Sequence, residues 1–265
     1  MSKQAANTIT ELMDAATRIA AIGGATAAGR FRDANLATER KADDSPVTEA
    51  DRAAERVMRE AITQRFPTHA ILGEEYGGEI PTEGFLWVLD PIDGTKTFVR
   101  GVPLYTTLVA VLHDGVPIVG TVLNPSTGES IVAGSDAGAW DERGRRVYVS
   151  GQTELSKAWF ATTDPTELLR RRGAGALELI KRAAATRTWA DAHGYLLVAR
   201  GDLDLMIDPI MAAWDVAPLG VIVREAGGYF SGIHDDAQLP TSGIAAASRE
   251  LADAALQLLH NTAAL

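Results

Sequence analysis

The sequence contains no cysteine, so a disulfide framework and a thiolate metal site are both excluded. No apolar run is long enough to span a bilayer, and Met1 to Arg30 lacks the basic start and apolar core of a signal peptide. We therefore expect a cytoplasmic protein with no membrane partner. Lys and Arg are too few to offset the acids, and the formal net charge of -10 argues against a nucleic-acid partner.

Several catalytic motifs are also missing. The five histidines show neither HxH nor HxxxH spacing, which argues against a zinc hydrolase. The patterns GxSxG, GxxxxGK[ST] and GxGxxG do not occur, which removes the common esterase, P-loop and dinucleotide-binding interpretations. With 265 residues, 46% of them apolar, and no repeat or Pro/Gly/Ser linker, the chain is long enough for one large domain or two lobes.

The most informative stretch is Trp87-Val88-Leu89-Asp90-Pro91-Ile92-Asp93-Gly94-Thr95. The apolar run from Phe85 to Leu89 predicts a buried strand that ends at Asp90. Pro91 fixes its own φ and Gly94 permits unusual backbone conformations, so Asp90 and Asp93 bracket a turn that can direct both carboxylates to one point.

Two carboxylates in a dry turn repel each other unless a proton or a cation lies between them. A hard ion such as Mg²⁺, which binds carboxylate, carbonyl and phosphate oxygens, would remove that conflict. Gly94, Thr95 and Lys96 would then offer amides and a hydroxyl to an anion. An ordinary type I turn explains the same spacing equally well when the stretch is taken alone.

Two other acidic stretches follow predicted strands. Ile71-Leu72 leads into Glu74 and Glu75, at most one of which should enter a site because neighbours on an extended segment point in different directions. A solvated acidic turn is the alternative. Asp208 ends a strand, and Asp215 precedes a helix expected from Val216 to about Ala226, with Pro218 in its first turn. Asp215 is placed either to cap that helix or to face a metal.

The polar connection from Lys41 to Thr48 has two interpretations. Thr48, with Asp51 three residues later, resembles a helix-start capping box. The alternative is that Lys41, Asp43 and Thr48 belong to a mobile loop over a site.

Hydrophobic periodicity predicts helices against an antiparallel sheet in the first half and an α/β arrangement in the second. The helices expected cover roughly residues 1–30, 167–171, 176–185 and 194–200, and a capped helix from Ser248. The strands expected cover a hairpin of 104–112 and 116–123, and the segments 130–133, 138–140, 146–149 and 203–207, with a short strand at Trp159.

Three motifs together resemble the inositol monophosphatase family: Gly73-Glu74-Glu75, the run from Asp90 to Thr95, and Trp214-Asp215 followed by Glu225-Ala226-Gly227-Gly228. The resemblance extends from the first helix to the last, and the stretches 96–108 and 194–199 are most similar to the histidinol-phosphate phosphatase branch. It implies an α+β / α/β fold, a layered α-β-α-β-α sandwich. Residues 1–265 would form one domain with lobes 1–155 and 156–265, assembled as a homodimer.

The resemblance also implies Mg²⁺ as cofactor, with two to three ions per site. One ion would be held by Glu74, Asp90 and the Ile92 carbonyl, and a second by Asp90, Asp93 and Asp215. Glu74, Thr95 and Asp51 would be the catalytic residues, with Glu74 and Thr95 orienting the attacking water, and the amides of Gly94 and Thr95 would bind phosphate. Lys41, Thr48 and Asp51 match a mobile loop that supports a third, weaker metal position.

For the substrate, the resemblance points to Asp191, Asp208 and Asp215. Carboxylates beyond the metal site suit a cationic amine and imidazole, and they also accept hydrogen bonds from a polyol. Ala190-Asp191-Ala192-His193 departs from the Gly-Asp-Cys-Tyr common in that branch; His193 either faces the pocket or is a solvated helix-end residue. We expect a Mg²⁺-dependent phosphomonoesterase acting on L-histidinol phosphate in histidine biosynthesis. The alternatives are an inositol-1-phosphate phosphatase and a catalytically silent phosphate-binding homologue.

Overall fold

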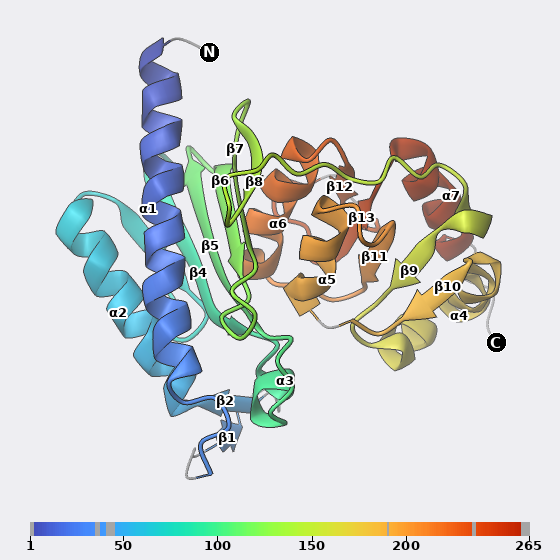
Figure 1. The fold of residues 1–265 in the computed structure, drawn as a ribbon, viewed down its shortest axis with the longest axis horizontal. Helices are drawn as coiled ribbons and strands as arrows, with labels where there is room; N and C mark the ends of the chain where they lie inside the picture. Colours follow the sequence, from blue (N-terminus) through green and yellow to red (C-terminus); the bar gives the residue numbers. More distant parts are fainter. Residues whose placement is uncertain (1–2, 35–37, 41–45, 190, 235–236, 261–265) are drawn as a thin grey trace.

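The computed structural model describes residues 3–34, 38–40, 46–189, 191–234 and 237–260. Helices and sheets alternate in five layers (Figure 1), which confirms the predicted α-β-α-β-α sandwich. α1 (Lys3–Ala28) and α2 (Glu49–Arg65) cover one face of a six-stranded sheet. α5 (Asp191–Ala199) and α6 (Ala213–Glu225) lie between this sheet and a five-stranded one. α4 (Pro165–Arg182) and α7 (Arg249–Leu259) cover the outer side of the second sheet.

The first helices form as their sequence predicts. Ile9, Leu12, Ala16 and Ile19 of α1 recur at helical spacing and are buried against the sheet. At the start of α2 both halves of a capping box are present, so the capping interpretation of Thr48 is confirmed. The preceding β1 (Thr38–Arg40) and β2 (Pro46–Thr48) form a small antiparallel pair. Lys41 and Asp43 lie outside the described residues.

The first sheet has the strand order β3-β4-β5-β6-β7-β8, and every neighbouring pair is antiparallel except β3 and β4. The β5–β6 hairpin is confirmed by the antiparallel pairing of the two strands. Asp114 and Gly115 between them both have positive φ, as a tight hairpin turn requires. The predicted strand over 146–149 is wrong: Arg146 forms only an isolated bridge to Trp140, and the Val149 amide donates to the carbonyl of Ala226, the residue that follows α6. The strands are β3 (Ala70–Gly73), β4 (Phe85–Asp93), β5 (Thr106–His113), β6 (Val116–Leu123), β7 (Ser130–Gly134) and β8 (Gly138–Asp141).

The second sheet is mixed, with the order β10-β9-β11-β13-β12. The two helices expected over 167–171 and 176–185 are confirmed as the two parts of α4, which are separated by a kink at Gly173, whose φ of 49° and ψ of -130° are not helical. Its predicted end at Ala185 is wrong, because that residue begins a strand. α7 is confirmed, with Ser248 as its N-cap. A short 3-10 turn covers Leu155–Lys157, and the strands are β9 (Trp159–Ala161), β10 (Ala185–Arg187), β11 (Leu205–Asp208), β12 (Tyr229–Ser231) and β13 (Gly243–Ala246).

α6 starts three residues earlier than the sequence predicts, at Ala213, with Ala212 as N-cap. Asp215 is therefore not the cap itself, and its carboxylate accepts a hydrogen bond from the Ala212 amide at 2.7 Å. Pro218 lies inside the helix and not in its first turn. The helix packs directly on β6, since a Cβ at Gly120 would lie 2.2 Å from the Pro218 carbonyl oxygen. This close approach brings the start of α6 to the end of β4.

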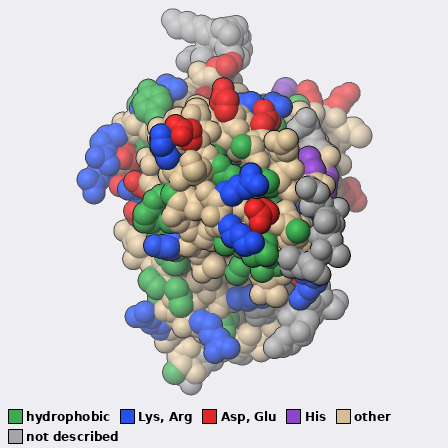
Figure 2. Space-filling view, turned by 90° about the vertical axis from the view of Figure 1, so that its right-hand side faces the viewer, with side chains coloured by type: hydrophobic (Ala, Val, Ile, Leu, Met, Phe, Trp, Pro, Cys, Tyr) green, Lys and Arg blue, Asp and Glu red, His purple; other side chains and the backbone are tan. Residues whose placement is uncertain are grey.

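The outer face over α4 and α7 carries both signs of charge. Figure 2 shows basic and acidic side chains next to one another on this side, in keeping with ion pairs such as Arg171–Glu167 at 2.6 Å and Arg249–Asp253 at 2.8 Å. No helix of the described residues combines the length and the apolar character that a membrane span requires.

Candidate active site

Three carboxylates converge where the first sheet meets α6. Asp90, Asp93 and Asp215 offer oxygens that lie within 4.8 Å of one another. The pairing of β4 with β5 explains how two acids of one strand can face one point. Asp90 pairs with Leu108 and Asp93 with Thr106, so three steps along β4 match two along β5. Such a bulge changes the side to which the strand presents its residues, and it lets Asp90 and Asp93 point the same way.

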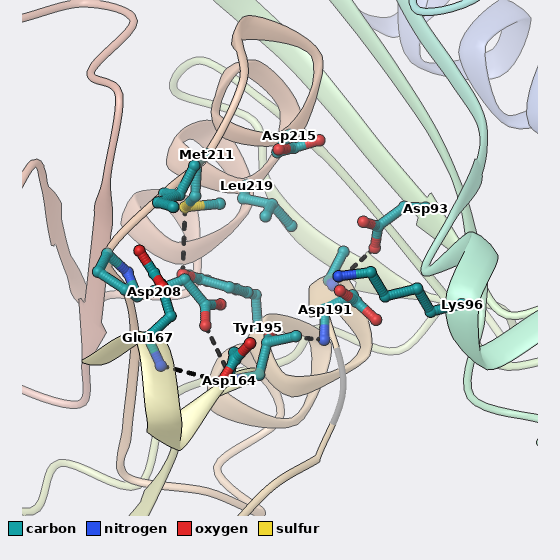
Figure 3. Close-up of a pocket in the computed structure, with 14 residues that line it drawn as sticks. Asp93, Lys96, Asp164, Glu167, Asp191, Tyr195, Asp208, Met211, Asp215 and Leu219 are labelled. Atoms are coloured by element: carbon teal, nitrogen blue, oxygen red, sulfur yellow. Dashed lines mark hydrogen bonds between the residues drawn. The ribbon is translucent and has the colours of Figure 1, made fainter. Parts of the chain in front are cut away.

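Each of these carboxylates is held by a hydrogen-bond donor. The Ile92 amide donates to Asp90 Oδ1 at 3.0 Å. Asp93 Oδ2 accepts from the Thr106 hydroxyl at 2.9 Å and from the Ala192 amide, at the start of α5, at 2.7 Å (Figure 3). Asp93 is thus fastened from both lobes, with one oxygen committed to the protein and the other directed at the cluster.

The electrostatics of the cluster are unfavourable without a cation. Burial, followed by the charges of Glu74, Asp93 and Asp215, raises the pKa of Asp90 well above its ordinary value. Burial and then the charge of Asp93 do the same to the pKa of Asp215, and burial raises the pKa of Asp93 to about 6. These groups must take up protons or a cation to become stable, and a set of oxygen ligands of this kind matches Mg²⁺.

Glu74 joins the cluster from the neighbouring strand. β3 runs parallel to β4, so both strands end at the same edge of the sheet, and the Glu74 amide donates to the Leu89 carbonyl at 3.1 Å. The charge of Glu74 raises the pKa of Asp90, and so does a hydrogen bond that the protonated Asp90 donates to the Glu74 side chain. The four acids singled out from the sequence, Glu74, Asp90, Asp93 and Asp215, therefore lie together.

Thr95 and Asp51 lie beside the cluster. Gly94, with a φ of 82°, precedes the short helix α3 (Thr95–Val99). The Thr95 hydroxyl lies 3.1 Å from the Ile92 carbonyl and 3.4 Å from Asp51 Oδ1. Asp51 Oδ2 is engaged by the amide and hydroxyl of Thr48, at 2.8 and 2.6 Å. Burial raises the pKa of Asp51 to about 6, a value suited to proton transfer near neutral pH.

A cavity of about 240 Å³ opens next to the carboxylate cluster and extends into the second lobe (Figure 3). Asp191 and Asp208, which the family resemblance links to the substrate, both line it. The Asp191 carboxylate lies over Gly94, where a Cβ would be 2.8 Å from Oδ2, so a side chain at position 94 has no room. The lining consists of Asp93, Lys96, Thr163, Asp164, Glu167, Asp191, Ala192, Tyr195, Asp208, Pro209, Ile210, Met211, Asp215 and Leu219.

The acids of the cavity are also perturbed. Asp208 Oδ1 accepts from the Thr163 amide at 2.8 Å, and burial raises its pKa to about 6 despite this bond. Burial, with the charges of Asp93 and Asp208, raises the pKa of Asp191 well above its ordinary value. Buried acids with raised pKa values are stabilised by a nearby positive charge, so the cavity favours a cationic group that can pair with the carboxylates.

Sequence reasoning missed Asp164 and Glu167, which come from the start of α4. Asp164 is the N-cap of this helix and accepts from the amides of Thr166 and Glu167, at 2.9 and 3.0 Å. Asp164-Pro165 followed by Glu167 is a helix-start pattern, so the start of this helix could have been recognised from the sequence. Its position at the cavity could not, because that depends on how the two sheets pack.

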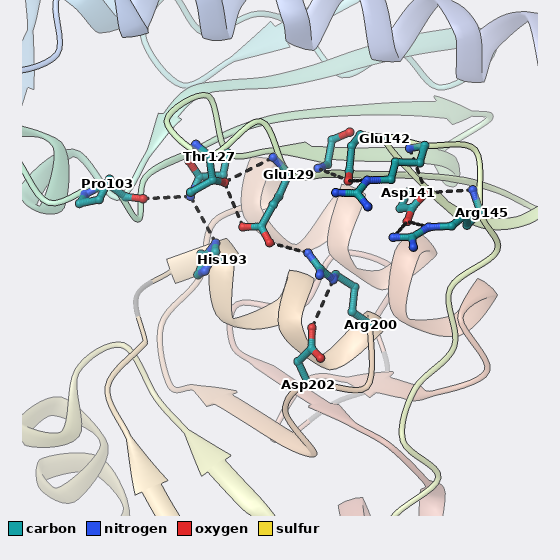
Figure 4. Close-up of polar contacts among 12 residues, drawn as sticks. Pro103, Thr127, Glu129, Asp141, Glu142, Arg145, His193, Arg200 and Asp202 are labelled. Atoms are coloured by element: carbon teal, nitrogen blue, oxygen red, sulfur yellow. Dashed lines mark hydrogen bonds and ion pairs between the residues drawn. The ribbon is translucent and has the colours of Figure 1, made fainter.

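His193 fits neither of the two expectations for it. It is 7% exposed and is not among the residues that line the cavity, so it neither faces the pocket nor lies in solvent. Its Nδ1 lies 3.4 Å from Asn124 Nδ2 (Figure 4), and burial lowers its pKa. His193 follows Ala192 into α5 on the side that packs against the first lobe.

Comparison with known proteins agrees with this geometry. The sequence model of the inositol monophosphatase family matches residues 8–264. A histidinol-phosphatase of Mycobacterium tuberculosis is 38% identical over 230 residues, which cover 84% of this chain and 87% of that protein. A histidinol-phosphatase of Streptomyces coelicolor is 40% identical over 230 residues, which cover 83% and 85%. The structure of an inositol monophosphatase from Zymomonas mobilis superposes with a TM-score of 0.82 at 31% identity, covering 95% of this chain and 98% of the other.

Proposed function

Since the chain belongs to the inositol monophosphatase family and is a phosphoric monoester hydrolase, we propose that it hydrolyses L-histidinol phosphate to L-histidinol and phosphate, in histidine biosynthesis, with Mg²⁺ as cofactor. The observation that carries the choice of substrate is the acidity of the cavity. Six carboxylates line it, from Asp93, Asp164, Glu167, Asp191, Asp208 and Asp215, against one basic side chain, Lys96.

This acidity matches the chemistry of the proposed substrate. Histidinol phosphate carries an amine on the carbon next to its phosphate-bearing carbon and an imidazole at the opposite end, and carboxylates such as Asp191 and Asp208 pair with such cations. The cavity volume of about 240 Å³ suits a small metabolite. The named activity of the two relatives, at 38% and 40% identity, supports the same substrate.

The residues present fit Mg²⁺. Glu74, Asp90, the Ile92 carbonyl, Asp93 and Asp215 would hold two ions, and the repulsion among these acids supports the assignment. When bound, the ions would supply positive charge for the phosphate and for the leaving oxygen, and would favour ionisation of water. A third, weaker ion near Asp51 stays a prediction.

The remaining steps belong to side chains of this chain. A water held by Glu74 and the Thr95 hydroxyl would attack phosphorus as the ester P–O bond breaks, in line with the leaving oxygen. The attacking water would lose one proton, and the leaving oxygen would gain one from solvent to become the alcohol. The Thr95 hydroxyl would donate a hydrogen bond to Asp51 Oδ1. The other carboxylate oxygen of Asp51 accepts a hydrogen bond from the Thr48 amide. The amides of Gly94 and Thr95 would bind phosphate oxygens, and Asp208, Asp191 and Asp215 would contact the alcohol part of the substrate.

Inositol 1-phosphate is the second candidate substrate. The solved Zymomonas mobilis relative is an inositol monophosphatase, and Asp191 and Asp208 could accept hydrogen bonds from a polyol. The catalytically silent alternative is not supported, because the relatives are named as phosphatases.

Phosphate release from L-histidinol phosphate and from inositol 1-phosphate, each with Mg²⁺ and with EDTA, tests the proposal. We expect Mg²⁺-dependent release with a higher kcat/KM for L-histidinol phosphate. A preference for inositol 1-phosphate would select the second candidate, and turnover that persists in EDTA would refute the Mg²⁺ assignment.

We further propose that residues 1–265 form one domain and that the protein acts as a homodimer in the cytoplasm, as the family resemblance suggests. Light scattering coupled to size-exclusion chromatography would give twice the chain mass of 28.1 kDa if this is correct. A mass of one chain at micromolar concentration would contradict the dimer.

A further inference from the structure

Glu55 is a carboxylate that lies wholly inside the protein and outside the catalytic set. It belongs to α2 and is 0% exposed. Its partners lie on α2 itself and in the segment that follows Glu74: Arg59 Nε donates to Oε1 at 2.7 Å, the Glu75 amide to Oε2 at 2.7 Å, and the Tyr76 amide to Oε1 at 3.3 Å. A buried carboxylate is stable only with such partners, so Glu55 and the segment after Glu74 depend on each other.

The segment that carries Glu74 is a closed turn seated on Glu55. Gly73 and Gly77 exchange both backbone hydrogen bonds, at 3.0 and 2.9 Å, and Arg59 also donates to the Gly77 carbonyl. Gly73 rests against the Glu55 carboxylate, because a Cβ there would be 2.0 Å from Oε1. Two sets of hydrogen bonds therefore hold the turn: those to the Glu55 side chain of α2, and the bond from the Glu74 amide to the Leu89 carbonyl of β4.

We propose that Glu55, together with Arg59, is a positioning residue that fixes the Glu74 carboxylate and thereby sets the affinity of the protein for Mg²⁺. This inference rests on the metal assignment under the proposed function. Without the Glu55 acceptors two amides of the turn lose their partners, and the turn must shift toward water to satisfy them. Glu74 moves with the turn, whereas Asp90, Asp93 and Asp215 keep their own donors. Metal binding weakens, and the fold and the phosphate end of the site remain.

Glu55→Gln is the sharpest test. Glutamine keeps the size of the side chain but replaces one carboxylate oxygen, an acceptor, by an NH₂ group, which is a donor. That NH₂ group would face an N–H donor, either the Glu75 amide or Arg59. Glu225→Gln is a matched control, since Glu225 also accepts from two backbone amides, those of Asp136 and Gly138 at 2.9 and 2.8 Å, at the far end of α6.

The readouts separate metal binding from turnover. Thermal unfolding is followed in EDTA and across a Mg²⁺ titration, and phosphate release is measured with p-nitrophenyl phosphate and with L-histidinol phosphate. For Glu55→Gln we expect the Mg²⁺ concentration at half-maximal stabilisation to rise about tenfold or more, as when a partner of a metal ligand is removed. We expect kcat at saturating Mg²⁺ to stay within about threefold of the wild type, because Glu74 that has bound the ion is again held beside the attacking water. Glu225→Gln should leave the Mg²⁺ midpoint unchanged.

A Glu55→Gln protein that has a lower Tm in EDTA but an unchanged Mg²⁺ midpoint would overturn the inference, because Glu55 would then be purely structural. If that variant does not fold, Gly73→Ala tests the same contact from the turn, with the same expected shift and the same refuting result. Failure of the substrate proposal appears separately, as a wild type that binds Mg²⁺ and cleaves p-nitrophenyl phosphate but not L-histidinol phosphate.

Discussion

Replacing Asp93 by Asn should inactivate the enzyme and at the same time stabilise the metal-free protein. The activity loss follows from the proposed role of Asp93 as a metal ligand. The stabilisation follows from removing a charge that is buried and that the other acids also repel. The Asn oxygen can still accept from Thr106 and from the Ala192 amide, while its NH₂ group faces Asp90 and Asp215 as a donor.

The size of the stabilisation follows from the pKa of Asp93. Its value of about 6 in the folded protein, against 3.8 ordinarily, corresponds to at most about 3 kcal/mol at pH 8. Because the side chain keeps some contact with solvent, we expect roughly 1–2 kcal/mol. In a chain of this size that raises the Tm in EDTA by about 2–6 °C.

Calorimetry in EDTA at pH 8 and phosphate release at saturating Mg²⁺ check both halves of this prediction. Asp141→Asn is the control of opposite sign: burial alone would raise the pKa of Asp141, but hydrogen bonds from Arg145 and nearby amides keep it below its ordinary value. That variant should lose stability and keep activity. A lower Tm for Asp93→Asn in EDTA would refute the electrostatic reasoning, and near-full turnover would refute the metal role.

Three further predictions concern pH, substrate choice and His193. In EDTA the Tm should rise as pH is lowered from 8 toward 5. Asp51, Asp93 and Asp208 have pKa values of about 6 in the folded protein, above their ordinary values, so in this pH range the folded protein binds more protons than the unfolded chain and is stabilised by them. A Tm that stays flat or falls would contradict this prediction. Asp208→Asn should lower kcat/KM for L-histidinol phosphate by about tenfold or more, from loss of a charge-assisted contact, and leave p-nitrophenyl phosphate hydrolysis within about twofold; equal losses for both substrates would exclude a role in recognising the cation. His193→Ala should lower the Tm with kcat/KM kept within about threefold, because the ring is buried against Asn124 and outside the cavity; lost turnover at an unchanged Tm would place it in the site.

Local patterns were sufficient for most of the helices and strands. The spacing of Ile9, Leu12 and Ala16 predicts α1, and the sequence Asp114-Gly115 predicts the β5–β6 hairpin, because both depend only on neighbouring residues. The start of α6 was misplaced because Asp215 bonds back to the Ala212 amide from within the helix, and a sequence pattern cannot distinguish that carboxylate from a cap.

The site was predictable as a set of residues and not as a geometry. The resemblance of three motifs identified Glu74, Asp90, Asp93 and Asp215, which the structure brings together. The bulge that turns Asp90 and Asp93 to one side depends on the register with β5, which no local pattern contains. From the sequence alone, Glu55 is one polar position among several in α2. Its role becomes apparent only from its hydrogen bonds with a turn about twenty residues further along the chain.

The hydrogen bond from the Ala192 amide to Asp93 joins residues 99 positions apart. A contact of this sequence separation forms only after the chain between has been closed into a loop, which is slow and entropically costly. Asp215 reaches the cluster from still further along the chain. We therefore expect the proposed cation site to form late in folding, so that a bound ion would stabilise the native state more than the folding transition state. Mg²⁺ would then slow the unfolding of the enzyme and leave the rate at which the chain folds unchanged.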